Sequence, residues 1–310
     1  MTLAVICSGQ GRQHSDMFAV TGEAPAASAL FRYAQTLLGG VDPRRMVREA
    51  SPELLHSNRY GQIVCTLQAL AAIEILRPSL PSQVVFAGYS VGEVAAWGVA
   101  GVFGHSSTLD LVAGRADIMD AVSSPGDGLL FIRGLARETI DRLCAKHGAA
   151  IAIINPQEAY IVGGTRVSLQ AVMQDARELQ PITIALLPVM VASHTKLMSR
   201  AAVEFGRVLN ATAAVFPLRS GLRLLSGVDG ASVSDVRLGL AKLARQISET
   251  VNWAACLQGC VEGGATCFLE LGPGDALSKM ARGAFPDIPS RSVDDFRSVA
   301  GVQAWVASRS

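Results

Sequence analysis

The sequence predicts an α/β fold in which a doubly wound, mostly parallel sheet carries an inserted βαββαβ subdomain. Short apolar runs alternate with helical patterns from the first residues to about residue 124, as they do in doubly wound sheets. A second rhythm of strands and helices occupies residues 126–189. Half of the 310 residues are hydrophobic and 17% are charged, a composition typical of a well-buried core.

The first part of the chain is expected to open with a strand at residues 1–6. This segment lacks the basic and long apolar parts of a signal peptide, so a strand is favoured over a targeting sequence. The apolar run at 84–87 predicts a further strand, and apolar positions within 108–122 indicate a helix. The Ser-Ser-Pro-Gly-Asp-Gly sequence at 123–128 predicts a linker.

The inserted segment shows strand and helix patterns in the order βαββαβ, which is that of a ferredoxin-like subdomain. Its strands are expected at 129–132, 150–154, 160–162 and 182–187. Two sets of residues at helical spacing indicate the helices between them: Ile140, Leu143 and Cys144, then Leu169, Val172, Met173 and Ala176.

The last part of the chain resumes the pattern of the first. A long helix is expected after Thr195, a strand at 267–271 and a tight turn at 272–275. The sequence therefore predicts a discontinuous large α/β subdomain at 1–125 and 190–310, with a small subdomain at 126–189.

Composition argues against several classes of function. The net charge is +1 and there is no basic arm, so neither nucleic acid nor a membrane surface is expected as a partner. No apolar stretch approaches the ~20 residues of a membrane span. The six cysteines have no C-x-x-C spacing and suggest a reduced, cytoplasmic protein. Cys256 and Cys260 are four residues apart without a supporting histidine, so no metal site is expected.

The segment Gly88-Tyr89-Ser90-Val91-Gly92 matches the G-x-S-x-G pattern of a nucleophile elbow. An apolar run precedes it and an Ala- and Val-rich helical segment follows it. Side chains that flank the serine would collide in such a tight turn, and glycine removes them. Ser90 is therefore predicted to be a nucleophile at a helix N-terminus. The alternative is a structural tight turn.

A serine nucleophile needs a base and donors for an oxyanion. Of the five histidines, His194 lies where the insert returns to the large subdomain, at an expected cleft. A buried structural histidine is the alternative. The Gly9-Gln10-Gly11 loop after the first strand could offer one backbone N–H, and Val91 a second. By itself this loop is also typical of an ordinary β-to-α turn.

Arg115 lies within the predicted helix at 108–122, among apolar positions. An arginine in this setting commonly extends to solvent or forms a surface ion pair. Its planar guanidinium could instead bind a substrate carboxylate through two hydrogen bonds. The local sequence favours neither interpretation.

These motifs together resemble the malonyl-CoA:acyl-carrier-protein transacylases across nearly the whole chain. The order and spacing of five matching stretches carry the resemblance: 8–13 (SGQGRQ), 88–93 (GYSVGE), 114–117 (GRAD), 192–194 (ASH) and 271–274 (LGPG). The sequence GYSVGE looks most like the branch that serves as the epsilon subunit of malonate decarboxylase. The fatty-acid branch usually has histidine where this chain has Tyr89.

The resemblance implies a hydrolase-like fold and a role for each matched residue. Ser90 would be acylated, His194 would be its base, and the N–H groups of Gln10 and Val91 would bind the oxyanion. Arg115 would hold the malonyl carboxylate.

Three further residues match positions of this family. Gln62 and Asn155 would line the pocket, and Asn252 would orient His194 through its backbone carbonyl.

The chain departs from the family pattern near the oxyanion loop. Cys7 and Ser8 replace the usual Phe-Pro, and Arg12 stands where relatives tend to carry a small residue. We expect Arg12 to bind a phosphate-bearing substrate arm, because guanidinium pairs well with phosphate oxygens. A solvated loop arginine is the alternative.

The implied reaction moves a malonyl group from malonyl-CoA, through malonyl-serine, to the thiol of an acyl carrier protein. The carrier arm would be phosphopantetheine or, in malonate decarboxylase, phosphoribosyl-dephospho-CoA, and no cofactor would be bound permanently. Three alternatives remain open at this point: a fatty-acid or polyketide transacylase, a serine thioesterase or hydrolase, and a non-catalytic subunit.

Overall fold

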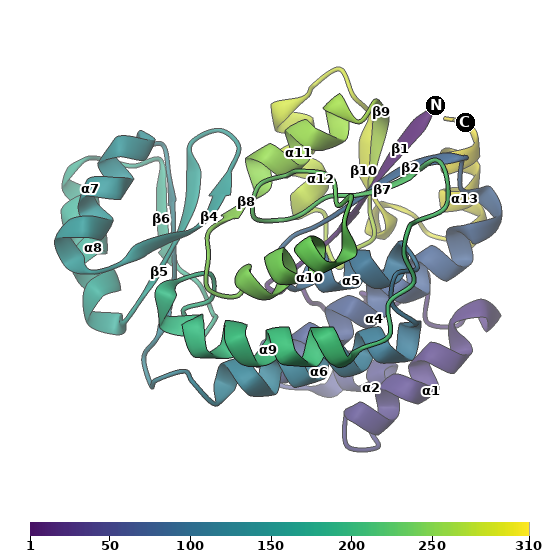
Figure 1. Ribbon diagram of the computed structural model, residues 1–310, viewed down its shortest axis with the longest axis horizontal. Helices are drawn as coiled ribbons and strands as arrows, with labels where there is room; N and C mark the ends of the chain where they lie inside the picture. Colours follow the sequence, from purple (N-terminus) through teal and green to yellow (C-terminus); the bar gives the residue numbers. More distant parts are fainter. Residues whose placement is uncertain (310) are drawn as a thin grey trace.

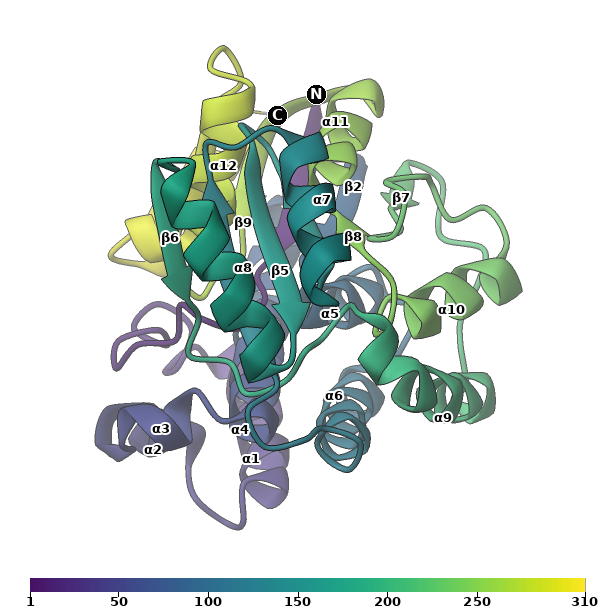
Figure 2. The ribbon, with the colours of Figure 1, turned by 90° about the vertical axis from the view of Figure 1, so that its left-hand side faces the viewer.

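The computed structural model describes residues 1–309, within which the strands form two separate sheets (Figures 1 and 2). The first sheet is parallel throughout, with the order β10-β9-β1-β2-β7. Its strands are β1 (Thr2–Cys7), β2 (Gln83–Gly88), β7 (Leu222–Leu224), β9 (Ala265–Glu270) and β10 (Ser290–Ser292). The parallel sheet predicted from the alternating pattern is confirmed.

Strand β1 lies at the centre of this sheet and explains why the sheet has helices on both faces. Leu3 and Val5 contribute to one hydrophobic cluster, whereas Ala4 and Ile6 contribute to another. Successive side chains of a strand point to opposite faces, so an unbroken apolar run requires cover on both sides. The predicted doubly wound arrangement is therefore confirmed.

The helices divide between the two faces (Figure 1). One cluster contains residues of α4 (Asn58–Leu76), α5 (Val91–Val99), α6 (His105–Asp120), α9 (Ser199–Ala211) and α10 (Val236–Arg245). The other contains residues of α11 (Trp253–Glu262) and α12 (Ala276–Ala284). The first cluster also contains residues of α1 (Ser28–Leu37), α2 (Pro43–Glu49), α3 (Pro52–Leu55) and α13 (Val299–Ala307). Within residues 1–309, no helix is both long and apolar enough to cross a bilayer.

The second sheet contains the predicted βαββαβ unit. Its order is β6-β3-β5-β4-β8, and all neighbours are antiparallel except β4 and β8. The unit comprises β3 (Gly128–Arg133), α7 (Arg137–His147), β4 (Ala150–Asn155), β5 (Ala159–Gly164), α8 (Arg166–Glu178) and β6 (Thr183–Leu186). Both helices pack on one face, the outer face in Figure 1. The ferredoxin-like subdomain is confirmed.

Two features of the fold differ from the sequence-based expectation. The helix predicted at 108–122 runs instead from His105 to Asp120, because Gly104 precedes it in an extended conformation and accepts a hydrogen bond from the Thr108 N–H. The two-residue strand β8 (Val251–Asn252) joins β4 from outside the insert, and it is too short to have a pattern. The subdomain boundaries at 125/126 and 189/190 stay a prediction.

Candidate active site

Ser90 lies in a tight turn between β2 and α5, as the sequence predicted. Its backbone has φ 57° and ψ −122°, a strained conformation for a residue with a side chain. A Cβ on Gly88 would lie 2.0 Å from the carbonyl oxygen of Gly92, and a Cβ on Gly92 would lie 2.2 Å from that of Cys7. Both flanking positions therefore require glycine, and Ser90 is held at the N-terminus of α5.

The side chains of Ser90 and His194 are in direct contact. Ser90 Oγ lies 2.8 Å from His194 Nε2, although 104 positions separate the two residues. His194 Nδ1 lies 2.5 Å from the carbonyl oxygen of Gln246. Because a carbonyl can only accept, Nδ1 carries the proton and Nε2 of the neutral ring is free to accept from Ser90. The pair has the geometry of a nucleophile and its base.

The prediction that Asn252 orients His194 is wrong, because Gln246 occupies that role. Gln246 ends α10 as its C-cap, where backbone carbonyls lack a partner within the helix. Its carbonyl is therefore available to His194. Asn252 lies in β8, where its N–H donates to Gly227 and its side chain accepts from the Ala255 N–H at the start of α11.

Gln246 also joins the other polar groups of the site through its side chain. Nε2 donates to the carbonyl oxygen of Ser90 and to Oε2 of Glu93, both at 2.8 Å. Oε1 accepts from Nη2 of Arg115 at 3.3 Å. Gln246 could not be predicted from the sequence, because no motif identifies a glutamine at a helix end as part of a distant site. The glutamate within GYSVGE was visible in the sequence but had no assigned role.

Arg115 is 1% exposed, so the surface interpretation of this arginine is wrong. Nη1 donates to Oε1 of Gln62 at 2.8 Å, while Nε has no hydrogen-bond partner within residues 1–309. Burial lowers the pKa of Arg115 to about 10, against the opposing effect of the Glu93 charge. Burial raises the pKa of Glu93 to about 7. The guanidinium is thus a buried cation with unused donor capacity.

His194 is also buried, at 1% exposure. Burial and the nearby charge of Arg115 lower its pKa to about 3, although the Gln246 carbonyl favours the protonated ring. The imidazole is therefore neutral near pH 7 and able to accept a proton. This places its titration well below the ordinary histidine range around 6.5.

A cavity of about 310 Å³ adjoins the Ser90 turn. The loop from Ser8 to Arg12 and the side chains of Tyr89 and Asn155 form part of its wall. Arg12 is exposed at this cavity, whereas Asn155 is only 3% exposed. Both polar atoms of the Asn155 amide lack a partner of normal geometry among residues 1–309. The amide is still close enough to Tyr89 to oppose the burial that raises the pKa of its hydroxyl.

The two residues predicted to donate to the oxyanion, Gln10 and Val91, belong to two segments that pack together beside Tyr89. Val91 begins α5, where the first N–H groups have no acceptor within the helix. The next two N–H groups are used locally, by the carbonyls of Tyr89 and Ser90. Gln10 follows Gly9, whose backbone packs so closely that a Cβ would lie 2.8 Å from the Tyr89 carbonyl oxygen. The Gln10 loop and the Ser90 turn are thus in contact.

Gln62 differs from Asn155 in its position. It is fully buried on α4, and its Nε2 donates to Oδ1 of Asn58 at 2.7 Å while its Oε1 accepts from Arg115. Gln62 does not line the cavity beside Tyr89. Its observed role is to hold the Arg115 guanidinium.

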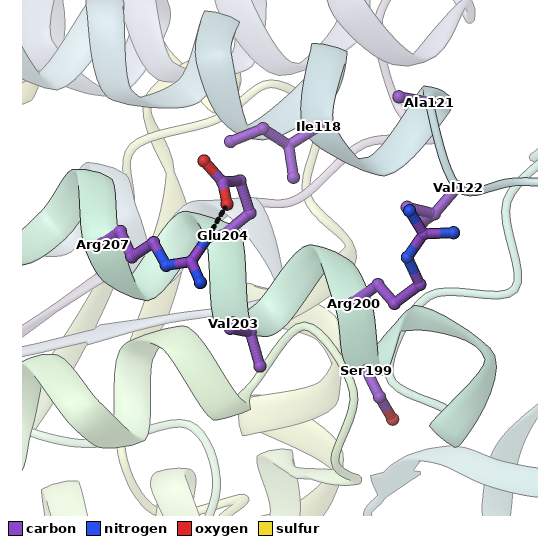
Figure 3. A pocket seen from close by; sticks show the side chains of 8 residues that line it. All are labelled: Ile118, Ala121, Val122, Ser199, Arg200, Val203, Glu204 and Arg207. Atoms are coloured by element: carbon purple, nitrogen blue, oxygen red, sulfur yellow. Dashed lines mark hydrogen bonds and ion pairs between the residues drawn. The ribbon is translucent and has the colours of Figure 1, made fainter.

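A second, larger groove of about 580 Å³ lies between α6 and α9 (Figure 3). Its wall contains no residue of the Ser90 site, and Arg207 forms an ion pair with Glu204 at 2.7 Å across one turn of α9. No group of three or more potential metal ligands occurs in the described residues 1–309. The Ser90 cavity is therefore the candidate active site.

Comparison with known proteins agrees with this geometry. The chain is 26% identical to a malonyl CoA-acyl carrier protein transacylase of Haemophilus influenzae, with 98% of both chains covered. It is 30% identical to polyketide synthase GfsB of Streptomyces halstedii over its whole length, which is 6% of that synthase. The crystal structure of FabD from Acinetobacter baumannii matches with a TM-score of 0.89 and 26% identity, covering 100% of this chain and 99% of that one.

The acyl transferase domain family matches residues 5–295, which include both Ser90 and His194 and the whole inserted subdomain. This chain therefore belongs to the acyl transferase domain family.

Proposed function

We propose that this protein is a malonyl-CoA:acyl-carrier-protein S-malonyltransferase that works through a malonyl-serine intermediate on Ser90. The observation that carries the proposal is the 2.8 Å contact between Ser90 Oγ and His194 Nε2 within one hydrogen-bond network with buried Arg115. The names of the transacylase relatives support the choice of donor and acceptor.

In the first half of the reaction, His194 Nε2 accepts the Ser90 proton as Oγ attacks the thioester carbonyl of malonyl-CoA. The N–H groups of Gln10 and Val91 would bind the developing oxyanion. When the carbon–sulfur bond breaks, the CoA sulfur takes the proton from His194. The Gln246 carbonyl keeps the ring oriented and stabilises it while it is protonated.

In the second half, the carrier-protein thiol gives its proton to His194 and attacks the malonyl-serine ester. The ester bond breaks, the malonyl group leaves on the carrier sulfur, and Ser90 Oγ regains the proton from His194. Both halves use the same oxyanion donors, since each passes through a tetrahedral intermediate on the same carbon.

Arg115 would bind the malonyl carboxylate during both steps. Its buried charge and its unpartnered Nε are suited to a charge-assisted contact, and Gln62 keeps the guanidinium in place. Asn155 would contact the acyl group or the amides of the pantetheine arm, because it lines the cavity and its amide has no partner of normal geometry among residues 1–309.

The finer assignment is the epsilon subunit of malonate decarboxylase, in the cytoplasm. It is supported by the sequence GYSVGE at 88–93 and by Arg12 at the cavity wall. A phosphoribosyl-dephospho-CoA arm carries more phosphate charge than phosphopantetheine, and Arg12 would bind that charge.

Ser90 is predicted to be the site of acylation. Incubation with malonyl-CoA in the absence of a thiol acceptor should add one malonyl group, measured by intact mass and mapped to the peptide that contains Ser90. The adduct should persist until a carrier thiol is added, because the enzyme transfers the group to thiols rather than to water. Equal labelling of Ser90→Ala, or rapid loss of the adduct as free malonate, would contradict the proposal.

Arg115 is predicted to select for an acyl carboxylate. Arg115→Ala should cost on the order of 2–4 kcal/mol in malonyl transfer, because the substrate carboxylate loses its buried partner. Acetyl transfer should be retained or improved, and Arg115→Lys should recover only part of the malonyl rate. The measurement is the rate of Ser90 acylation by each donor. An equal loss for malonyl and acetyl groups would instead indicate a structural role.

Arg12 is predicted to recognise the phosphates of the CoA or carrier arm. Arg12→Ala should weaken malonyl transfer from malonyl-CoA and leave transfer from phosphate-free malonyl-pantetheine nearly unchanged. Arg32→Ala removes an exposed arginine on α1 and serves as the matched control. Unchanged half-saturation by malonyl-CoA in Arg12→Ala would refute this role.

The rate of Ser90 acylation is predicted not to fall near pH 6.5, where a histidine base of ordinary pKa would become protonated. Because the pKa of His194 is lowered to about 3, its neutral form persists as the pH falls and is lost only near that value. The ratio of the acylation rate constant to the malonyl-CoA concentration at half-saturation should therefore change little as the pH passes 6.5. Glu93→Gln removes the neighbouring group with a pKa of about 7 and isolates the effect of His194. A sigmoidal fall centred near pH 6.5 in both proteins would contradict the prediction.

A further inference from the structure

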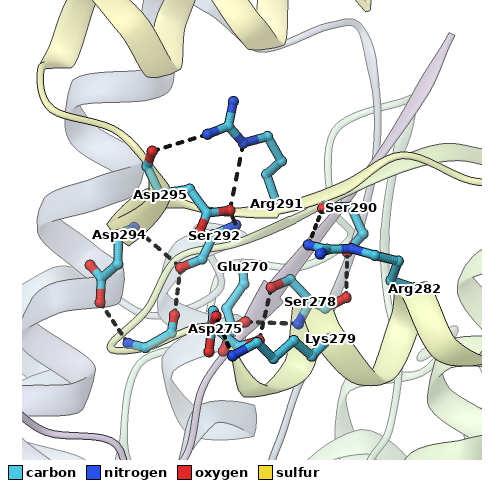
Figure 4. Close-up of polar contacts among 11 residues, drawn as sticks. Glu270, Asp275, Ser278, Lys279, Arg282, Ser290, Arg291, Ser292, Asp294 and Asp295 are labelled. Carbon is cyan, nitrogen blue, oxygen red and sulfur yellow. Dashed lines mark hydrogen bonds and ion pairs between the residues drawn. The ribbon is translucent and has the colours of Figure 1, made fainter.

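A buried carboxyl group lies behind the oxyanion loop and takes no part in the reaction above. Glu270 ends β9 and has no exposed surface, and Ser8, which follows β1, is 5% exposed. Ser8 Oγ donates to Oε1 of Glu270 at 2.7 Å. The Ser278 N–H donates to Oε2 of Glu270 at 2.8 Å, and Figure 4 shows these two residues. One side chain thus links the ends of two neighbouring strands to the first turn of α12.

Hydrogen bonds alone compensate the burial of Glu270. No arginine, lysine or histidine forms an ion pair with it within residues 1–309. Burial raises the pKa of Glu270 to about 7, although the N–H groups of Leu277 and Ser278 and the hydroxyl of Ser8 oppose that rise. Leaving any of these buried donors or acceptors unpaired would be costly, because a polar group that has lost its hydration needs a hydrogen-bond partner.

The first turn of α12, which donates to Glu270, is itself held in place by hydrogen bonds to β10. Ser290 Oγ donates to the Ser278 carbonyl at 2.9 Å, and Arg282 Nη2 donates to the Ser290 carbonyl at 3.0 Å. These bonds attach α12 to β10 (Figure 4). The carboxyl group therefore lies at the end of β9, where it accepts from the residue that follows β1 and from the first turn of α12.

The oxyanion loop is held at both of its ends. Ser8 anchors the start of Gly9-Gln10-Gly11 to Glu270. At the other end, the Gly11 N–H donates to Oε1 of Gln13 at 2.5 Å, and Gln13 Nε2 donates to the Leu55 carbonyl at 3.3 Å. Between these anchors, Gly9 packs against the Tyr89 carbonyl. Gln10 is also held by its own side chain, whose Nε2 donates to the Asn58 carbonyl at 3.2 Å, while the Ser8 hydroxyl attaches the loop to the parallel sheet.

We propose that Ser8 and Glu270 act as a positioning pair that places the Gln10 N–H for oxyanion binding. The inference rests on the proposed function, and it names two residues at the back wall of the cavity that form no hydrogen bond with Ser90 or His194 within residues 1–309. Oxyanion donors work only when they are held close to the productive geometry, and an anchored loop meets that need.

The test measures two quantities in each variant: the rate of Ser90 acylation and the mobility of the Gly9-Gln10-Gly11 loop. Ser8→Ala should lower the maximal acylation rate by about tenfold and leave half-saturation by malonyl-CoA within about twofold, because the loop acts on the transition state. Amide hydrogen exchange in the peptide that covers residues 8–13 should become faster. Ser8→Cys, nearly equal in size but a weak donor, should show the same changes if Ser8→Ala does not fold.

Two further variants separate positioning from general stability. Glu270→Gln should retain most of the acylation rate, because its amide oxygen can accept from Ser278 while its NH₂ donates to Ser8. Glu270→Leu has a similar volume and no polar atoms, and should behave as Ser8→Ala does. Ser290→Ala removes a buried serine of the same polar cluster that does not contact the loop, and should leave the acylation rate and the exchange of 8–13 unchanged.

The outcomes distinguish this inference from the proposed function. If wild-type protein acquires no malonyl group on Ser90, the proposed function fails, and the exchange of residues 8–13 in Ser8→Ala still decides whether the anchor exists. If wild-type protein is labelled but Ser8→Ala is labelled at the same rate, only the positioning pair is refuted. Equal rate losses in Ser8→Ala and Ser290→Ala would also refute it.

Discussion

The strained backbone of Ser90 is the constraint on which the rest of the site depends. A conformation of this kind costs of the order of 1–3 kcal/mol, and it persists only where surrounding structure imposes it. Here Gly88 and Gly92 allow α5 to approach the end of β1 so closely that no side chain would fit between them. That approach brings the N-terminus of α5, the Cys7 carbonyl and the Gly9-Gln10-Gly11 loop together at one end of the parallel sheet.

Three ionisable side chains are buried around this turn, each with few hydrogen-bond partners: Arg115, Glu93 and His194. Gln246 connects them, since its amide and its backbone carbonyl together contact Ser90, Glu93, Arg115 and His194. In a poorly solvated site such contacts are stronger than in water, and each unpaired group is correspondingly costly. A substrate carboxylate beside Arg115 would supply the partner that its Nε lacks, which ties the electrostatics of the site to the proposed choice of acyl group.

Much of this arrangement could be predicted from local sequence. The doubly wound sheet, the βαββαβ insert and the strand–turn–helix around Ser90 follow from periodicity and glycine placement, which act over a few residues. The role of Asn252 was predicted wrongly, and Gln246 was missed. Both errors concern the backbone carbonyl that accepts from His194. The pattern of side chains in a sequence does not indicate which carbonyl at a helix end will lie next to a distant histidine. Strand β8 was not predicted, because a strand of two residues is too short to show an alternation of apolar and polar side chains.

The sequence by itself determined the elements, their order and the identity of Ser90 as the residue in the tight turn, because the signals for these lie in adjacent residues. Only the tertiary structure decided that His194 reaches Ser90, that Arg115 is buried rather than solvated, and that Glu270 accepts a hydrogen bond from Ser8. The residues in these contacts are far apart in the chain: 104 positions separate Ser90 from His194, and 131 separate Arg115 from Gln246. Ser8 and Glu270 are 262 positions apart. Their partners are selected by the packing of the sheet and its helices, and that packing has no signature within any single segment.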